Sequence, residues 1–151
     1  MFFRNEYAFL SNMTKTPITF DYQGYRFIMP SSENAFQAMK VYVSDAPLDV
    51  KLTWLKQVEE AEPKDSKALG RKLPINLEAW GEMSGKAMRQ VLLEKFARGS
   101  HFADLLLATG EVELVEDNNH GDTLWGAVNG VGENRLGKIL MDVRDYLRRP
   151  F

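Results

Sequence analysis

The sequence predicts an α+β protein that is mainly helical and carries a small antiparallel β-sheet. Two observations favour this class. Residues 18–29 alternate between apolar and polar side chains around a central glycine, and most later segments repeat apolar residues at helical spacing. The length of 151 residues suits one domain with a sizeable core. We therefore expect a single compact domain over residues 1–151, with a sheet near its start and helices after it.

The first predicted element is a β-hairpin. Apolar residues alternate on both sides of Gln23-Gly24, at Ile18, Phe20, Tyr22, Tyr25, Phe27 and Met29. Gly24 can adopt the positive φ that a two-residue hairpin turn requires. The alternation therefore predicts two short strands that pair across this turn.

A helix that follows Pro30 is the segment on which the functional prediction depends. Ser31 or Ser32 can cap it by accepting from the free N–H groups of its first turn, and Glu33 then lies where the helix dipole favours negative charge. Glu33, Gln37 and Lys40 stand at i, i+4 and i+7, so they share one face. This face is either a solvated polar stripe or part of a site. We expect the helix to end near residues 44–47.

Apolar periodicity predicts further helices over residues 48–60, after Pro63, and over 77–98, 102–108 and 133–148. Leu77 and Trp80 belong to the predicted buried stripe of the helix 77–98. Gly81 and Gly85 in its first half indicate a break or a close approach of another backbone. Residues 111–116 alternate imperfectly and indicate a strand.

Composition excludes several classes of protein and site. The net charge of −2 gives no global field that would recruit nucleic acid or an anionic membrane. The absence of cysteine excludes disulfides, thiol nucleophiles and thiolate metal sites. His101 and His120 are too few and too far apart to indicate a metal centre, so we expect neither metal nor cofactor. With no signal-peptide pattern and no long apolar run, we expect a cytoplasmic protein without a membrane partner. The oligomeric state is not predicted.

A Gly-rich loop before the last helix is the second candidate for chemistry. A helix N-terminus after such a loop offers free N–H groups to a phosphate, although an ordinary turn has the same pattern. The loop matches neither a dinucleotide-binding fingerprint nor a P-loop. Trp125 is either a stacking platform for a ring or a core residue. The candidate residues of this loop are Asp122, Trp125, Gly126, Gly132 and Asn134.

Two smaller groups of polar residues complete the candidates. Lys67 and Arg71 stand at i, i+4 in the predicted helix after Pro63, and they either bind a phosphate or form a solvated face. Asn12, which follows Ser11 near the start of the chain, either hydrogen-bonds a ligand or ends a strand.

Taken together, the motifs resemble the YbiA-like family, also called the NADAR superfamily. They follow the family's order over nearly the whole chain. They are Phe9-Leu10-Ser11-Asn12, Gly24, the run from Ser31 to Lys40, Lys67-x-Leu-Gly-Arg71, Trp80, Met88 with Lys95-Phe96, Leu106 with Thr109-Gly110, Asp122-x-x-Trp125-Gly126, Gly130-x-Gly132-x-Asn134-x-Leu136-Gly137, and Arg144. Two positions depart from the family pattern: Asn34 stands where the family often has His, and Val128 stands where it commonly has Gly.

The resemblance implies a mainly helical α+β domain that hydrolyses N-glycosidic bonds. The substrate classes that it implies are phosphorylated ribosylamino-pyrimidine intermediates of riboflavin synthesis and ADP-ribose attached to guanine. The expected partner is thus a small nucleotide-like molecule, or an ADP-ribosylated guanine within nucleic acid. The Asn34 departure removes a candidate proton carrier beside Glu33, and the Val128 departure alters the loop expected to hold the base or ribose.

Cleavage of a ribose C1′–N bond assigns chemical roles to these residues. Glu33 can stabilise oxocarbenium character at C1′ or activate water, and Lys40 can attack C1′ as a neutral amine and form a Schiff base. We expect Asp122 to orient ribose hydroxyls, Trp125 to stack on the base, and Lys67, Arg71 and the turn 132–134 to hold phosphate. The alternatives are a non-catalytic module that binds nucleotides or ADP-ribose, and a structural domain.

Overall fold

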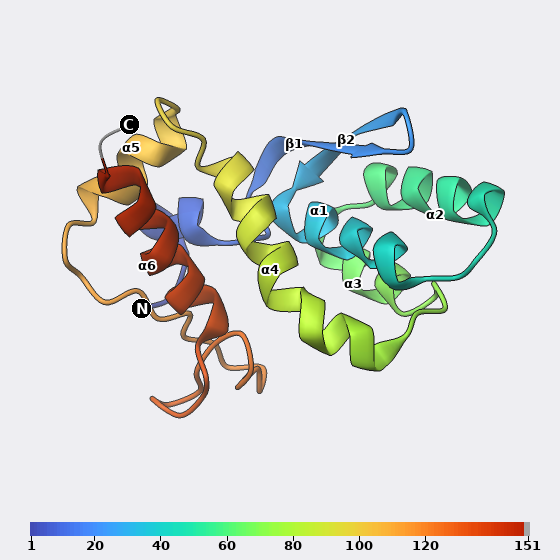
Figure 1. Ribbon diagram of the computed structural model, residues 1–151. Coiled ribbons are helices and arrows are strands. Elements are labelled where there is room, and N and C mark those ends of the chain that lie inside the picture. Colours follow the sequence, from blue (N-terminus) through green and yellow to red (C-terminus); the bar gives the residue numbers. More distant parts are fainter. Residues whose placement is uncertain (150–151) are drawn as a thin grey trace. The chain divides into compact units, whose positions relative to one another are not determined.

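The computed structural model describes residues 1–149 and confirms the α+β class. In chain order the elements are η1 (Asn5–Leu10), β1 (Lys15–Tyr22), β2 (Tyr25–Ser31), α1 (Ser32–Ala38), η2 (Met39–Val43), α2 (Leu48–Glu60), α3 (Pro63–Gly70), α4 (Leu77–Lys95), α5 (His101–Ala108) and α6 (Arg135–Arg148), where η marks a 3₁₀ helix (Figure 1). No helix in the described part is long and apolar enough to cross a membrane.

The chain divides into two compact units, and the division falls inside α4. Unit 2 is Asn12–Ala87, and unit 1 combines Met1–Ser11 with the chain from Met88 onward. That residues 1–151 form a single domain stays a prediction.

The predicted hairpin opens unit 2. β1 and β2 pair antiparallel, with Phe20 opposite Phe27 in the register. Gln23 and Gly24 both have positive φ, at 48° and 85°, which is the two-residue turn that matches the twist of the strands. The inward side chains of the alternation, among them Phe20 and Phe27, are buried.

The helix α1 lies at the centre of unit 2. It contacts both strands, α2 and α3 (Figure 1), and every residue from Ser32 to Ala38 is buried. The predicted cap is confirmed, because the Ser31 hydroxyl accepts from the N–H of Asn34 at 3.2 Å. At Met39 the α-helix gives way to the 3₁₀ turn η2. Residues 41–43 are Val-Tyr-Val, and β-branched and aromatic side chains weaken a helix.

Two details predicted for α4 are wrong. The helix runs without a break past Gly81 and Gly85, and a Cβ added at either glycine would meet nothing within 4 Å. A glycine costs about 1 kcal/mol in a helix interior, which the rest of a long helix tolerates. Leu77 is 78% exposed because it stands at the first position of α4, outside the buried stripe.

Unit 1 contains α5 and α6, which pack together, and η1, which contacts α5. The strand predicted over residues 111–116 is wrong. The backbone N–H of Glu116 and the carbonyl of Leu114 are bonded by the side chain of Asn134 instead of by a neighbouring strand. The alternating pattern there buries Leu114 alone, with Val112 half exposed.

Candidate active site

The carboxylate and the amide on α1 are buried and joined. Glu33 is 4% exposed and Gln37 is 5% exposed, and the Nε2 group of Gln37 donates to Oε1 of Glu33 at 2.9 Å. The predicted common face of the helix is therefore an internal one, and the solvated-stripe alternative does not describe Glu33 and Gln37. A buried carboxylate requires such a donor, because burial without a partner is costly.

Lys40 reaches the same region from η2. A Cβ built on Gly70 would lie 2.0 Å from Oε1 of Gln37 and 2.9 Å from Nζ of Lys40. Only a glycine at this place lets the end of α3 come so close to α1. Gln37 and Lys40 thus meet at one point for two reasons: their spacing along the chain and the close approach of α3.

The surroundings of Lys40 favour its neutral form. Burial lowers the pKa of the Lys40 amine most strongly, Glu33 opposes this effect, and the positive charge of Arg71 reinforces it. An amine whose pKa is lowered is a better nucleophile at neutral pH. The half-buried Lys40 can therefore act as a nucleophile or a proton acceptor.

Trp80 forms one side of this group, although the apolar spacing of its helix predicted only a core residue there. Its ring lies 5.6 Å from Nζ of Lys40 and 5.1 Å from the ring of Phe36. Trp80 is half-buried. A half-buried indole beside an amine can both lower the local polarity and offer a face to a ring of a ligand. The signal in the sequence that could have indicated a role for Trp80 is its place among the motifs shared with the family.

The backbone of Glu33 is held by Asn12. The carbonyl of Asn12 accepts from the N–H of Glu33 at 3.0 Å, and its Oδ1 accepts from the hydroxyl of Ser32 at 2.8 Å. Asn12 is buried, and these two hydrogen bonds anchor the first turn of α1. A contact between Asn12 and substrate stays a prediction.

Asn34, which stands where the family often has His, has a structural role in this chain. Its amide donates to the carbonyls of Val58 at 2.9 Å and Ala61 at 3.0 Å, at the end of α2. It also makes a 2.5 Å contact with the hydroxyl of Ser31. The residue after Glu33 thus joins α1 to α2.

Lys67 and Arg71 lie in unit 2, on either side of Gly70 along the chain. Lys67 is on α3 and half-buried, and Arg71 caps the C-terminus of α3 and is exposed. Arg71 is close enough to affect the pKa of Lys40, which places a fixed positive charge near the amine. Phosphate binding by either side chain stays a prediction.

The loop before α6 belongs to unit 1, and its local order comes from side chains that bond to the backbone. Oδ1 of Asp122 accepts from the N–H of Trp125 at 2.9 Å and from that of Leu124 at 3.1 Å. Asn118 in turn accepts from the N–H of Asp122 at 3.0 Å. Asp122 therefore shapes the turn that presents the half-buried Trp125.

The first two N–H groups of α6 are already bonded. Those of Arg135 and Leu136 donate to the carbonyls of Leu124 at 3.1 Å and Trp125 at 3.0 Å, and the N–H of Asn134 donates to that of Gly126 at 3.2 Å. A phosphate at this turn would have to use other groups. Substrate contacts of Gly126, Gly132 and Asn134 stay predictions.

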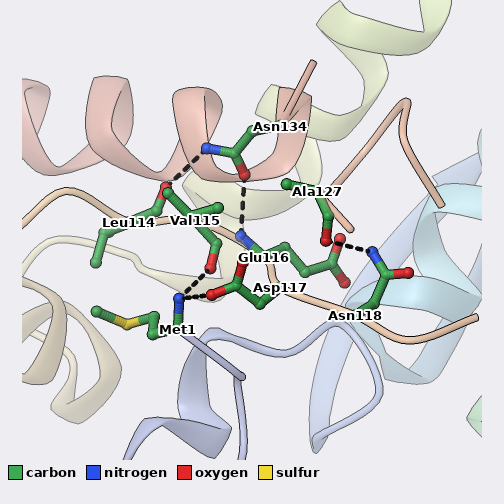
Figure 2. A network of polar contacts seen from close by, with 8 residues as sticks. All are labelled: Met1, Leu114, Val115, Glu116, Asp117, Asn118, Ala127 and Asn134. Atoms are coloured by element: carbon green, nitrogen blue, oxygen red, sulfur yellow. Dashed lines mark hydrogen bonds and ion pairs between the residues drawn. The ribbon is translucent and has the colours of Figure 1, made fainter. Parts of the chain in front are cut away.

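Figure 2 shows how this loop is tied to residues 114–118. Asn134 spans the Leu114 carbonyl and the Glu116 N–H, Asn118 donates to the carbonyl of Ala127, and the amine of Met1 contacts Asp117. The side chain of Asn134 is thus engaged within the protein. Val128 pairs with Val131 across a tight turn, so the departure at this position is part of regular local structure.

Lys95 is a buried amine in unit 1 for which the sequence predicted no functional role. It is 4% exposed, its Nζ donates to the carbonyl of Ser11 at 2.8 Å, and it lies 5.1 Å and 5.8 Å from the rings of Phe96 and Phe102. Burial lowers its pKa to about 7. The available signal was a lysine at helical spacing within the apolar stripe of the predicted helix 77–98.

The predicted cleft would combine residues of both units. Glu33 and Lys40 belong to unit 2, and Asp122 and Trp125 belong to unit 1. That the four line one cleft stays a prediction.

Comparison with known proteins confirms the resemblance that the motifs indicated. A family model described as the NADAR domain matches residues 1–148. N-glycosidase YbiA of Shigella boydii is 33% identical over 146 residues, which cover 95% of this chain and 83% of that protein. A riboflavin biosynthesis protein of Vibrio vulnificus is 36% identical over 121 residues, which cover 79% of this chain and 31% of that protein.

A solved structure has the same fold. The NMR structure of the E. coli protein YbiA aligns with a TM-score of 0.72 and 29% sequence identity, over 95% of this chain and 79% of that chain.

Proposed function

Because the chain belongs to the NADAR domain family, we propose that it hydrolyses the ribose C1′–N bond of a phosphorylated ribosylamino-pyrimidine or of an ADP-ribosylated guanine. In general terms it is an N-glycosidase, a hydrolase of N-glycosyl bonds. The riboflavin biosynthesis relative supports the pyrimidine substrate. The observation that carries the proposal is the buried Glu33–Gln37 pair with the half-buried Lys40 beside it.

Departure of the base nitrogen leaves positive charge on the sugar at C1′. In one route the carboxylate of Glu33 stabilises this charge and takes a proton from the attacking water. The water oxygen then bonds to C1′, and the departed base, which keeps the electron pair of the broken C1′–N bond, takes up the proton that Glu33 removed from water. This route uses Lys40 only to bind or orient the sugar.

In the other route the neutral amine of Lys40 bonds to C1′ as the C1′–N bond to the base breaks. The base keeps the electron pair of that bond and takes up a proton released by the Lys40 nitrogen. The sugar opens to a Schiff base, and water then hydrolyses the imine to give ribose phosphate or ADP-ribose and the free amine. The lowered pKa of Lys40 supports this route, because only the unprotonated amine can attack. In both routes we assign phosphate contacts to Lys67 and Arg71, the ribose hydroxyls to Asp122, and the base to Trp125.

The test is a substrate panel with mass spectrometric detection of the released base and sugar. The panel contains ribosylamino-pyrimidine phosphates, ADP-ribosylated guanosine, NAD and ADP-ribose. Glu33→Gln and Lys40→Ala should each lower kcat about 10²–10⁴-fold on the true substrate. Glu82→Gln and Lys86→Ala, two exposed changes on α4, are the matched controls.

Two further outcomes decide between mechanisms. The double variant should be little slower than the slower single variant, because residues that act as a unit are non-additive. A borohydride-trapped sugar adduct on Lys40 would support the Schiff-base route, and its absence with Glu33→Gln inactive would support direct attack by water. The proposal would be overturned in favour of a binding module if the unaltered protein and both single variants bind compounds of the panel but cleave none of them.

A further inference from the structure

The amide oxygen of Gln37 is a buried acceptor that accepts no hydrogen bond. Gln37 is 5% exposed, and Oε1 has no hydrogen-bond partner, whereas Nε2 is bonded to Glu33 at 2.9 Å. A carboxylate can only accept, so its bond to Nε2 determines the orientation of the amide. Oε1 therefore faces away from Glu33. An unsatisfied buried acceptor costs stability, so its presence calls for an explanation, and a role at a site is one of them.

The amine of Lys40 is a candidate donor to this oxygen. Oε1 of Gln37 and Nζ of Lys40 stand 2.0 Å and 2.9 Å from the same point, the place that a Cβ of residue 70 would occupy. Because residue 70 is glycine, this space is open to both groups. A protonated lysine has three donors, and movement of its side chain into this space would bring one of them to Oε1.

From this geometry we infer that Gln37 is a positioning residue that couples Glu33 to Lys40. Its Nε2 holds the carboxylate, and its Oε1 accepts a hydrogen bond from the amine of Lys40 whenever that nitrogen is positively charged. The role extends to the protonated imine of the Schiff-base route, and this part of the inference rests on the proposed function. The neutral amine is a weaker donor, so Oε1 stabilises the charged forms selectively.

The coupling affects the protonation of Lys40. The charged groups that affect the pKa of this amine are Glu33 from α1 and Arg71 from the end of α3, and the ring of Trp80 lies beside it from α4. Burial lowers the pKa of Lys40, and an acceptor at Oε1 limits that lowering. Gln37 thus keeps the amine able to take up and release a proton without adding a second charge beside Glu33.

The test measures the pKa of Lys40 directly, without substrate. The ¹³Cε signal of Lys40 is followed by NMR as a function of pH and is assigned by its loss in Lys40→Arg. Gln37→Met removes the acceptor in a side chain of similar length and should lower the pKa by about one unit, the size expected for one hydrogen bond to a charged group. Gln37→Glu places a negative charge there and should raise the pKa.

The lowered pKa in Gln37→Met is the diagnostic result, because the negative charge in Gln37→Glu raises the pKa of a nearby amine with or without a hydrogen bond. Gln57→Met on α2, an exposed glutamine in the same unit, should leave the pKa unchanged. Shifts of the same sign in the Met and Glu variants, or shifts no larger than that of the control, would overturn the inference.

A kinetic measurement separates this inference from the proposed function. On a cleaved substrate, the acidic limb of the pH profile of kcat/KM should move to lower pH in Gln37→Met, while a merely less stable protein would lose amplitude without a shift. If the panel is not cleaved at all, the proposed function fails, and the NMR titration still decides whether Gln37 sets the pKa of Lys40.

Discussion

Replacing Lys95 should remove a pH dependence of stability that the native protein carries. The amine of Lys95 is buried against aromatic rings, and burial is the sole cause that lowers its pKa, from 10.5 to about 7. Lys95→Met keeps an unbranched side chain of similar length, and its sulfur makes favourable contacts with rings such as Phe96. The variant therefore removes the titrating group with little change in packing.

The sign of the effect follows from where the proton binds. Between about pH 7 and 10.5, Lys95 is neutral in the folded protein and protonated in the unfolded chain, so unfolding takes up a proton. The free energy of unfolding therefore rises with pH across this window and loses this contribution as the pH falls to 7. At about 1.4 kcal/mol per pH unit, the whole window corresponds to on the order of 5 kcal/mol.

The assay is urea unfolding of the native protein and Lys95→Met at pH 7 and 9.5. Between these values the native protein should gain about 3 kcal/mol relative to the variant. Loss of the bond to the Ser11 carbonyl adds a term that is the same at both pH values and cancels in the comparison. Lys138→Met, an exposed change on α6, should follow the native protein. An equal change with pH in the native protein and Lys95→Met would refute the reasoning.

Three further predictions concern single residues. Arg71→Gln should raise KM more than it lowers kcat if phosphate is bound equally in the ground and transition states. Steady-state kinetics on a cleaved substrate measures both constants, and an unchanged KM would place Arg71 outside the site. Asn34→Ala should lower the free energy of unfolding by about 2–3 kcal/mol, because the carbonyls at the end of α2 lose their donor. A change below about 0.5 kcal/mol in urea unfolding would contradict that role. Gly81→Ala and Gly85→Ala should each raise the free energy of unfolding by roughly 0.5–1 kcal/mol, because both positions are helical with open space for a methyl group. A loss of stability in either variant would contradict the continuous helix.

Local patterns in the sequence determined most of the secondary structure and part of the site. Alternation around Gln23-Gly24 predicts the hairpin, because the side-chain period of a strand is two and the turn needs positive φ. The i, i+4 spacing predicts that Glu33 and Gln37 meet, and they are hydrogen-bonded. The cap at Ser31 is equally local. Each of these interactions joins residues within a few positions, so propensity and periodicity are sufficient to predict it.

Tertiary structure decided which polar groups are buried and what they contact. Gln37 and Lys40 reach one point because Gly70 of α3 approaches α1, and Trp80 lies over the amine from α4. The strand expected at residues 111–116 is absent because Asn134, far along the chain, takes its backbone bonds. The lowered pKa of Lys95 likewise arises from burial. Desolvation and contacts between distant segments depend on packing in three dimensions, and no period along the chain records them.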